Sequence, residues 1–375
     1  MIDYLEVSSE KNRDNRFTKE DVLSVSGEYG IVNQIEFQGR SFAGASVSNY
    51  GVVENGDVVY TKSPLKSNPY GIIKTNKGIP GIVSTLYAVY KPKEITDSKF
   101  VQIYFELDSR MNSYMHPLVN KGAKNDMKVS AENALKGMVS FPKKDEQEMI
   151  SLYFSTIDNL ITLHQRKCEQ TKKLKKYMLQ KMFPQNGAKV PEIRFYGFTY
   201  DWEQRKFGSL LEETRNKTIF EDEDTLLSCA IDGMYLNSEL FSHFRGSSNI
   251  GYLKVKKNDL ILSAQNLHLG NCNVNLRFEH GIISPAYKVY ELVGCNPLFM
   301  QAWVKKDSTK DFFLKSSTEG ASVCRKNIVW EELYKQELPV PSIEEQTKVG
   351  EYFYSLDHLI TLHQRQHKLH LNMLL

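Results

Sequence analysis

A few polar side chains in this 375-residue chain have a spacing that could support chemistry. His164 and Cys168 are four residues apart, as are His363 and His367, and this spacing places ligand-type side chains on one face of a helix. His370 follows about one turn later. The first copy offers only a histidine and a cysteine, without a carboxylate or a closing pair. We therefore expect no metal site, and interpret His164 and His363 as polar seam positions that fix the register of a helix pair.

The string Asn296-Pro297-Leu298-Phe299 is similar to the N-P-P-F motif of adenine methylases. Its third residue departs from the motif, and the nearest candidate turn for a nucleoside cofactor, residues 244–248, lacks the second glycine that close backbone approach requires. We expect no methyltransferase activity. Cys324 beside Arg325 fits either an activated thiol or a free, partly buried cysteine, and we favour the second.

Polar and basic side chains gather in several presumed loops. Glutamine and asparagine can hold adenine by two hydrogen bonds, whereas lysine and arginine suit guanine or phosphate. The alternative is an ordinary solvated loop. The candidate DNA contacts are Arg40, Lys62, Ser63, Lys66, Tyr70, Lys74, Lys121, Lys124, Lys128, Arg245, Gln265, Asn266, His268, Arg325 and Lys326.

Composition describes a globular protein with apolar material for two cores. Hydrophobic residues make up 41% and charged residues 25%, and the net charge of +3 is too small to prove a polyanionic partner. The five cysteines are odd in number and form no C-x-x-C, so we expect free thiols. No run of about 18 apolar residues and no secretory signal occur, which predicts a cytoplasmic location.

One heptapeptide, LITLHQR, occurs at residues 160–166 and again at 359–365, an offset of 199. Each copy belongs to a stretch that follows a proline, continues with acidic residues and carries apolar residues every three or four positions. This pattern predicts two long helices that pair as a coiled coil; the first, residues 145–183, would be roughly 58 Å long. The expected seam and partner residues are Ile157, Leu160, Ile161, His164, Leu356, Leu359, Ile360 and His363.

Before each helix lies a region of short β-rich runs broken by turn residues. Residues 81–90 and 281–290 agree at 6 of 10 positions, and Gly122-Ala123 corresponds to Gly320-Ala321. These two places fit tight turns with glycine at positive φ and equally fit turns that present nearby lysine and arginine side chains to DNA phosphate, and the two interpretations are compatible. Elsewhere the two regions share little. Common helices with different globules indicate one scaffold that carries two different readers. The expected domains are 1–141, 142–184, 185–339 and 340–375.

The repeated helical segments closely resemble the conserved regions of the specificity subunit of type I restriction-modification enzymes. Residues 142–184 carry this pattern, residues 341–375 repeat it in part, and residues 191–213 resemble the opening of a target recognition domain in that family. The resemblance covers nearly the whole chain. Both ends depart from it: MIDYLEVSSEKN already matches the stretch near residues 210–217, and Leu375 corresponds to Lys176, so we expect both ends to be shortened.

The resemblance implies an α+β fold: a pseudo-twofold tandem repeat of two globular α/β target recognition domains joined by two long antiparallel coiled-coil helices. Each domain would read one half of a bipartite, asymmetric site in double-stranded DNA. The chain would be a non-catalytic subunit that docks two modification (methyltransferase) subunits and restriction subunits, without a membrane. It would hold no cofactor itself; S-adenosylmethionine, ATP and Mg would be bound by those partners. The alternative is a coiled-coil scaffold without sequence-specific DNA binding.

Overall fold

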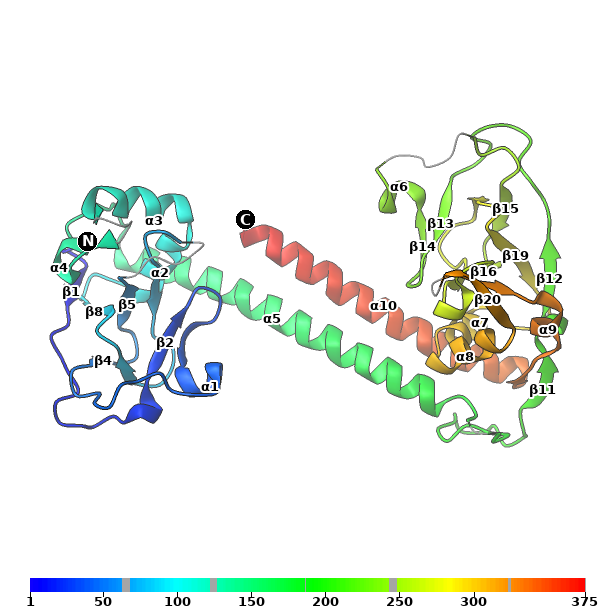
Figure 1. Cartoon of the computed structure of the whole chain (residues 1–375), viewed down its shortest axis with the longest axis horizontal. Helices are drawn as coiled ribbons and strands as arrows, with labels where there is room; N and C mark the ends of the chain where they lie inside the picture. Colours follow the sequence, from blue (N-terminus) through cyan, green and yellow to red (C-terminus); the bar gives the residue numbers. More distant parts are fainter. Residues whose placement is uncertain (63–67, 122–126, 186, 243–247, 323–324, 375) are drawn as a thin grey trace. The chain divides into compact units, whose positions relative to one another are not determined.

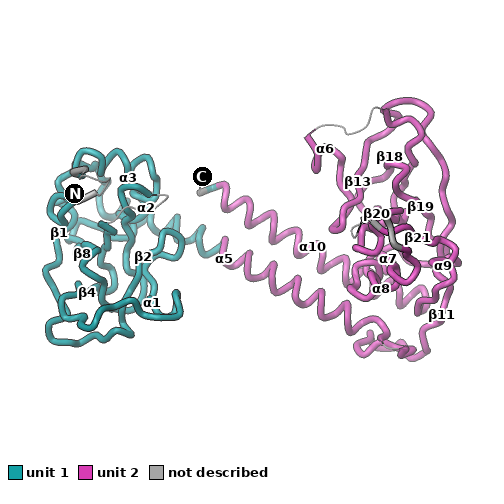
Figure 2. Tube along the Cα trace, viewed as in Figure 1, with its two compact units in different colours: residues 1–160, 373–375 teal, residues 161–372 magenta. Residues whose placement is uncertain are grey.

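The computed structural model describes residues 1–375 except 63–67, 122–126, 186, 243–247, 323–324 and 375, and only the backbone of residues 120–121, 127–128, 319–322, 325 and 374. The chain forms two compact units, residues 1–160 with 373–375 and residues 161–372 (Figure 2). Each unit contains a small antiparallel sheet with short helices, and the long helices α5 and α10 pack together within the second unit (Figure 1). The predicted α+β class with two sheet domains and a long helix pair is confirmed.

The first unit is built on a four-stranded sheet in the order β1-β8-β5-β6. Two-stranded pairs β2–β3, β4–β7 and β9–β10 complete its β structure among the described residues. Its elements are β1 (Leu5–Val7), η1 (Lys19–Asp21), β2 (Leu23–Ser26), β3 (Gly30–Asn33), α1 (Gln34–Gln38), β4 (Gly51–Val53), β5 (Val58–Thr61), β6 (Ile73–Thr75), β7 (Gly81–Val83), β8 (Tyr87–Pro92), α2 (Ser98–Glu106), α3 (Asp108–Met115), η2 (His116–Leu118), β9 (Asn120–Lys121), β10 (Met127–Lys128), α4 (Ala131–Ala134) and the first part of α5 (Lys144–Lys181).

The second unit repeats this topology, with a sheet in the order β12-β19-β16-β17 and pairs β13–β14, β15–β18 and β20–β21. It also contains the pair β11–β22. Its elements are β11 (Glu203–Lys206), η3 (Phe207–Leu210), β12 (Leu211–Thr214), β13 (Leu227–Cys229), β14 (Met234–Leu236), α6 (Asn237–Leu240), β15 (Leu253–Lys256), β16 (Leu260–Ser263), η4 (Leu267–Leu269), β17 (Cys272–Val274), β18 (His280–Ile283), β19 (Tyr287–Leu292), α7 (Pro297–Val304), α8 (Asp307–Lys315), β20 (Ser317–Ser322), β21 (Arg325–Ile328), α9 (Trp330–Lys335), β22 (Glu337–Val340) and α10 (Ile343–Leu374).

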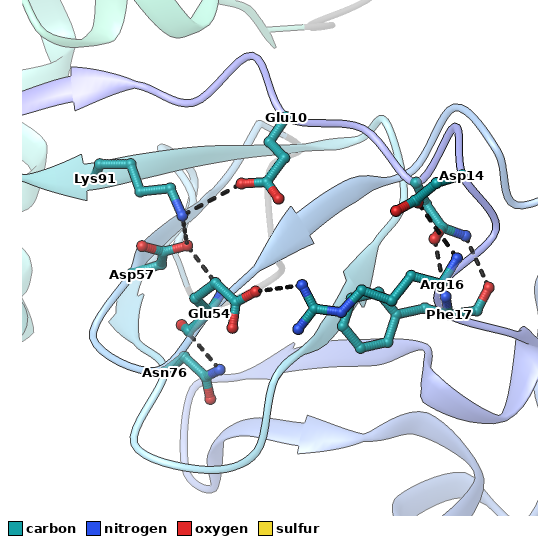
Figure 3. Close-up of polar contacts among 9 residues, drawn as sticks. Glu10, Asp14, Arg16, Phe17, Glu54, Asp57, Asn76 and Lys91 are labelled. Atoms are coloured by element: carbon teal, nitrogen blue, oxygen red, sulfur yellow. Dashed lines mark hydrogen bonds and ion pairs between the residues drawn. The ribbon is translucent and has the colours of Figure 1, made fainter.

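A buried aspartate fixes the turn before the central strand of each unit. In the first unit the carboxylate of Asp57 accepts a hydrogen bond from the backbone N–H of Glu54 and pairs with Lys91 at 3.1 Å, while Asn76 donates to the Glu54 carbonyl (Figure 3). In the second unit Asp259 accepts from the N–H of Lys256 at 2.7 Å. Burial raises the pKa of Asp259 to about 6.

The repeated glycines Gly81 and Gly281 lie where another segment of the backbone approaches closely. A Cβ on Gly81 would lie 2.6 Å from the carbonyl oxygen of Asp21, and one on Gly281 would lie 2.9 Å from that of Thr225. A larger residue at either position would push the neighbouring backbone segment away. The repeat in this stretch is therefore a packing requirement of the fold.

The repeated glutamine of the helix starts docks each globule on its long helix. Gln147 accepts from the N–H of Asp97 at 3.0 Å and donates to the Pro142 carbonyl at 2.9 Å. Gln346 accepts from the N–H of Asn296 at 2.7 Å and donates to the Pro341 carbonyl at 2.9 Å. Both side chains are fully buried, so these bonds form away from water.

The segment that follows α5 contributes to the core of the second unit. Phe183 lies 5.4 Å from the ring of Phe299 and 6.0 Å from that of Phe353, and Trp202 packs on Phe299 at 5.8 Å. Phe183 and Trp202 are 1% and 2% exposed. Burial of such a side chain stabilises a fold by about 1.5–3 kcal/mol.

One expectation about turns is wrong within the described residues. Gly320 and Ala321 lie inside β20, which pairs with β21 through an irregular register between Thr318 and Ser322. A strand position needs no positive φ. Their sequence counterparts, Gly122 and Ala123, lie outside the described residues.

Candidate nucleic-acid interface

Four of the predicted contact residues come together in the second unit. Ser263, at the end of β16, accepts hydrogen bonds from the backbone N–H groups of Gln265 and Asn266 and so shapes the loop that leads to η4. The N–H of Lys326 donates to the Gln265 carbonyl at 3.2 Å, which brings β21 against this loop. Gln265 is exposed and Asn266 and Lys326 are partly exposed, so amide and cationic groups share one surface.

His268 belongs to this cluster but lies beneath it. The residue is 8% exposed, and neither ring nitrogen has a hydrogen-bond partner among the described residues. The pKa of His268 is lowered mainly by burial and to a smaller extent by the positive charge of the neighbouring Lys326, so the neutral ring is favoured. In this conformation His268 supports the loop from below and does not face outward as a base-reading group would.

The first unit places Lys62 and Tyr70 on either side of residues 63–67, which lie outside the described residues. Lys62 follows β5, and its backbone N–H donates to the Leu86 carbonyl at 3.1 Å. The pKa of Lys62 is lowered mainly by partial burial and to a smaller extent by the nearby Lys11, whereas the negative charge of Glu132 raises it. The ring of Tyr70 meets that of His116 edge-on, with centroids 6.2 Å apart.

The glycine after Tyr70 is required by the course of the chain. Gly71 has a φ of +78°, and a Cβ there would lie 2.2 Å from the carbonyl oxygen of Thr61. Only glycine adopts this conformation at that distance. The backbone that presents Tyr70 is therefore held close to the end of β5.

Lys74 occupies a different environment from the other basic candidates. Its ammonium pairs with Glu106 at 2.9 Å, and its side chain is only 9% exposed. Glu106 also accepts a hydrogen bond from Gln102. Lys74 thus links β6 to α2, and its ammonium is already paired with a carboxylate.

The remaining predicted contacts are scattered or not described. Arg40 follows α1, and its guanidinium lies 4.6 Å from the ring centroid of Phe42. Five of the residues singled out in the sequence lie outside the described residues: Ser63, Lys66, Lys124, Arg245 and Cys324. The structure describes only the backbone of three others, Lys121, Lys128 and Arg325. Lys11 and His116, which lie near Lys62 and Tyr70, were not among the predicted contacts, because no spacing rule connects them to those residues.

The helix pair of the second unit is antiparallel. Nδ1 of His164 in α5 lies 3.2 Å from Nδ1 of His363 in α10, and the His164 ring stacks on His370 at 5.4 Å. Further along α5, Lys175 pairs with Asp357 at 2.5 Å. The partner number falls as the α5 number rises, as the predicted antiparallel coiled coil requires.

The predicted seam residues differ in burial. Ile157 and Leu356 are 4% and 6% exposed, and Leu160, Ile161, Ile360 and the two histidines are partly buried. Leu359 is 41% exposed and therefore lies on the outer side of α10. The described residues contain no group of three or more histidine, cysteine or acidic side chains that could hold a metal ion.

The residues that resembled a methylase motif are a helix cap. Asn296 accepts from the N–H groups of Leu298 and Phe299 at the start of α7, and its amide donates to Thr347. These bonds occupy the side chain in a structural role. The described cysteines, Cys168, Cys229, Cys272 and Cys295, are free and buried, and burial raises the pKa of Cys229 to about 11.

The whole chain has counterparts among solved structures. The crystal structure of a type I restriction-modification system S subunit from M. genitalium matches over 99% of this chain and 92% of that chain, with 14% identity and a TM-score of 0.54. This chain has the S-subunit fold. The HsdS subunit from Thermoanaerobacter tengcongensis matches with 13% identity, 98% and 92% coverage and a TM-score of 0.44.

A third match comes from a structure that concerns complex assembly and conformational transition of the type I restriction-modification system. It has 12% identity, coverage of 98% and 91% and a TM-score of 0.41. Comparison with protein-family models finds no match, and comparison with curated proteins finds none either. In the part of the chain that the structure describes, no helix combines the length and apolar character needed to cross a bilayer.

Proposed function

We propose that the chain is the non-catalytic DNA sequence-recognition subunit of a cytoplasmic type I restriction-modification complex. The observation that carries this proposal is the S-subunit fold over 99% of the chain. Two units with one strand order but different loops support it, because a common frame with different surfaces suits two different half-sites. Residues 1–141 and 185–339 would be the two target recognition domains.

In the proposed complex, accessible side chains of both units contact DNA: Gln265, Asn266 and Lys326 in the second unit, and Lys62, Tyr70 and Arg40 in the first. Gln265 and Asn266 would read base edges in the major groove, and Lys326 would bind a phosphate. Lys62, Tyr70 and Arg40 would serve the first unit in the same way. The buried His268 would hold the Gln265 loop in place.

The long helices would dock two modification subunits, and through them the restriction subunits. The second unit leaves apolar side chains of both helices in water: Leu163 is 43% exposed, Leu359 41%, Leu362 39% and Leu369 59%. Exposed leucines on paired helices are suited to a partner helix surface. S-adenosylmethionine, ATP and Mg would be bound by these partners.

The test is methylation mapping with the chain and its modification subunits. We expect adenine methylation at a two-part motif with a fixed gap, and exchange of residues 1–141 for those of another S subunit should change only one half of the motif. A continuous palindrome, or no motif, would contradict the proposal. A scaffold without sequence preference would bind specific and unrelated DNA equally at every salt concentration.

A further inference from the structure

The second unit contains a cavity of about 810 Å³ that is lined by residues of all four of its longer helices, α5, α7, α8 and α10. Part of its wall is apolar and is formed by Leu179, Leu298, Phe353 and Ile360. Small-molecule sites are typically concave spaces of this size with an apolar wall and a few polar groups. The DNA contacts proposed above make no use of this cavity.

Four of the five lysines that line the cavity already have an acceptor. The pairs are Lys175 with Asp357 at 2.5 Å, Lys176 with Asp307 at 3.5 Å, Lys172 with Glu169 at 2.9 Å, and Lys305 with the backbone carbonyls of Ile231 and Cys272 at 2.7 and 2.9 Å. A carboxylate or a pair of carbonyl groups thus offsets each of these four charges.

The fifth lysine, Lys306, is buried without an anionic partner. It is 9% exposed, and in the described part of the second unit its ammonium meets only the ring of Phe183, at 4.7 Å from the centroid. Burial lowers the pKa of Lys306 to about 8, so the side chain is still mostly a cation at neutral pH. A buried cation without a counter-ion destabilises a fold, and the face of an aromatic ring offsets only part of that cost.

The first unit shows that the fold does not require a lysine at this place. An offset of 199 relates α2 to α7 and α3 to α8, so Leu107 corresponds to Lys306. Each of the two residues immediately precedes its helix, and neither caps that helix with its side chain. The same corner between two helices is therefore made with an uncharged, 53% exposed residue in one unit and with a buried lysine in the other. The geometry of the corner does not explain the buried charge, whereas a bound anion does.

We propose that this cavity binds a small organic monocarboxylate, whose carboxylate pairs with Lys306 and whose apolar body lies against the apolar wall. One unpaired cation matches one negative charge. Asp232 and Asp311 also line the cavity, and their carboxylates disfavour a ligand with a second negative charge. The inference goes beyond DNA recognition and rests on the second unit alone.

The first test uses octanoate, the full chain and isothermal titration calorimetry at pH 7. We expect saturable 1:1 binding with a Kd of about 10–100 µM. Acetate lacks the apolar body and 1-octanol lacks the charge, so each should bind at least about tenfold more weakly. Absence of saturable octanoate binding, or equally tight binding of acetate or 1-octanol, would overturn the proposal.

Octyl phosphate tests the choice of a single charge. It has the same apolar body but carries about 1.5–2 negative charges at pH 7. We expect it to bind more weakly than octanoate, because only one unpaired cation faces it. Tighter binding of octyl phosphate would overturn the choice of a monocarboxylate.

The variant Lys306→Met removes the ammonium and keeps a side chain of similar shape. Octanoate binding should weaken at least about tenfold, and the midpoint of urea denaturation without ligand should stay equal or rise, because a buried unpaired charge is gone. A lysine with a purely structural role would give a lower midpoint. Lys315→Met, at an exposed position of the same helix, should leave binding unchanged. Unchanged binding by Lys306→Met, or a lower midpoint, would refute the assignment.

A second variant tests the cavity without changing its charge. Leu276 lines the cavity and is partly buried, so Leu276→Trp should fill part of the space while Lys306 stays in place. Octanoate binding should weaken about tenfold. Circular dichroism checks that the variant is folded. Full binding by a folded Leu276→Trp variant would show that octanoate binds elsewhere.

Discussion

At the scale of single residues, the paired glutamines explain why the chain repeats a Glu-Gln sequence after each proline. Gln147 and Gln346 each connect the start of a long helix to the N-terminus of a shorter helix in the adjoining globule. The amide group can donate and accept at once, and no apolar side chain replaces both bonds. The repeat is present in the sequence, but its docking role depends on neighbours 50 residues away.

Substitution of Gln346 tests this docking contact. Gln346→Ala removes the acceptor for the Asn296 N–H and the donor to the Pro341 carbonyl and leaves both groups buried. We expect the free energy of unfolding to fall by about 2–4 kcal/mol, measured by urea denaturation. The exposed Gln364→Ala on the same helix should change it by less than about 0.5 kcal/mol. Equal effects would contradict the assigned role.

At the scale of elements, the helix pair departs from an apolar coiled-coil seam. His164 meets His363 and His370, and His367 and His370 each have a buried ring nitrogen without a described partner. The pKa of His164 is lowered mainly by burial and to a smaller extent by the neighbouring groups His363, His370, Lys167 and His367. The pair is therefore most stable when the His164 ring is neutral.

Acidification should loosen this part of the helix pair. A group whose pKa is lower in the folded state stabilises the fold above its unfolded pKa, here 6.5, and that contribution is lost as the pH falls below it. We expect amide-exchange protection of residues 161–181 and 343–372, corrected for intrinsic exchange, to be lower at pH 5.5 than at pH 7.5. The double variant H164L/H363L should lose this dependence, and the exposed His358→Leu should keep it. Equal protection at both pH values in the unsubstituted chain would refute the argument.

At the scale of the whole molecule, one strand order is used twice and one continuous helix, α5, begins in the first unit and ends in the second. Duplication keeps the frame while the loops on it diverge. Under the proposed function, the length of the helix pair determines how many base pairs separate the two half-sites.

Paired insertions test this determination of the gap. Seven residues added after Gln170 and seven after Thr361 lie opposite each other in the antiparallel pair and preserve its seam, because seven residues make almost two turns. The pair becomes roughly 10 Å longer, so the unmethylated gap should lengthen by about three base pairs. Methylation mapping measures the gap. An insertion in α5 alone shifts Lys175 away from Asp357 and should abolish or disturb methylation. An unchanged gap in the paired variant would show that the length of the helix pair does not set the gap.

The sequence by itself determined the helix pair, the twin β-rich regions and the repeated glycines and glutamines. These features follow from local signals: apolar spacing of three and four, prolines before helix starts, and turn residues between strands. A repeat inside one chain also shows directly which positions perform the same task.

Only the tertiary structure decided which of the predicted contacts face water. It buried Lys74 against Glu106, buried His268 near Lys326 and placed Leu359 on the exposed side of α10. Burial and ion pairing depend on residues distant in the sequence, which the type and spacing of neighbouring residues do not specify.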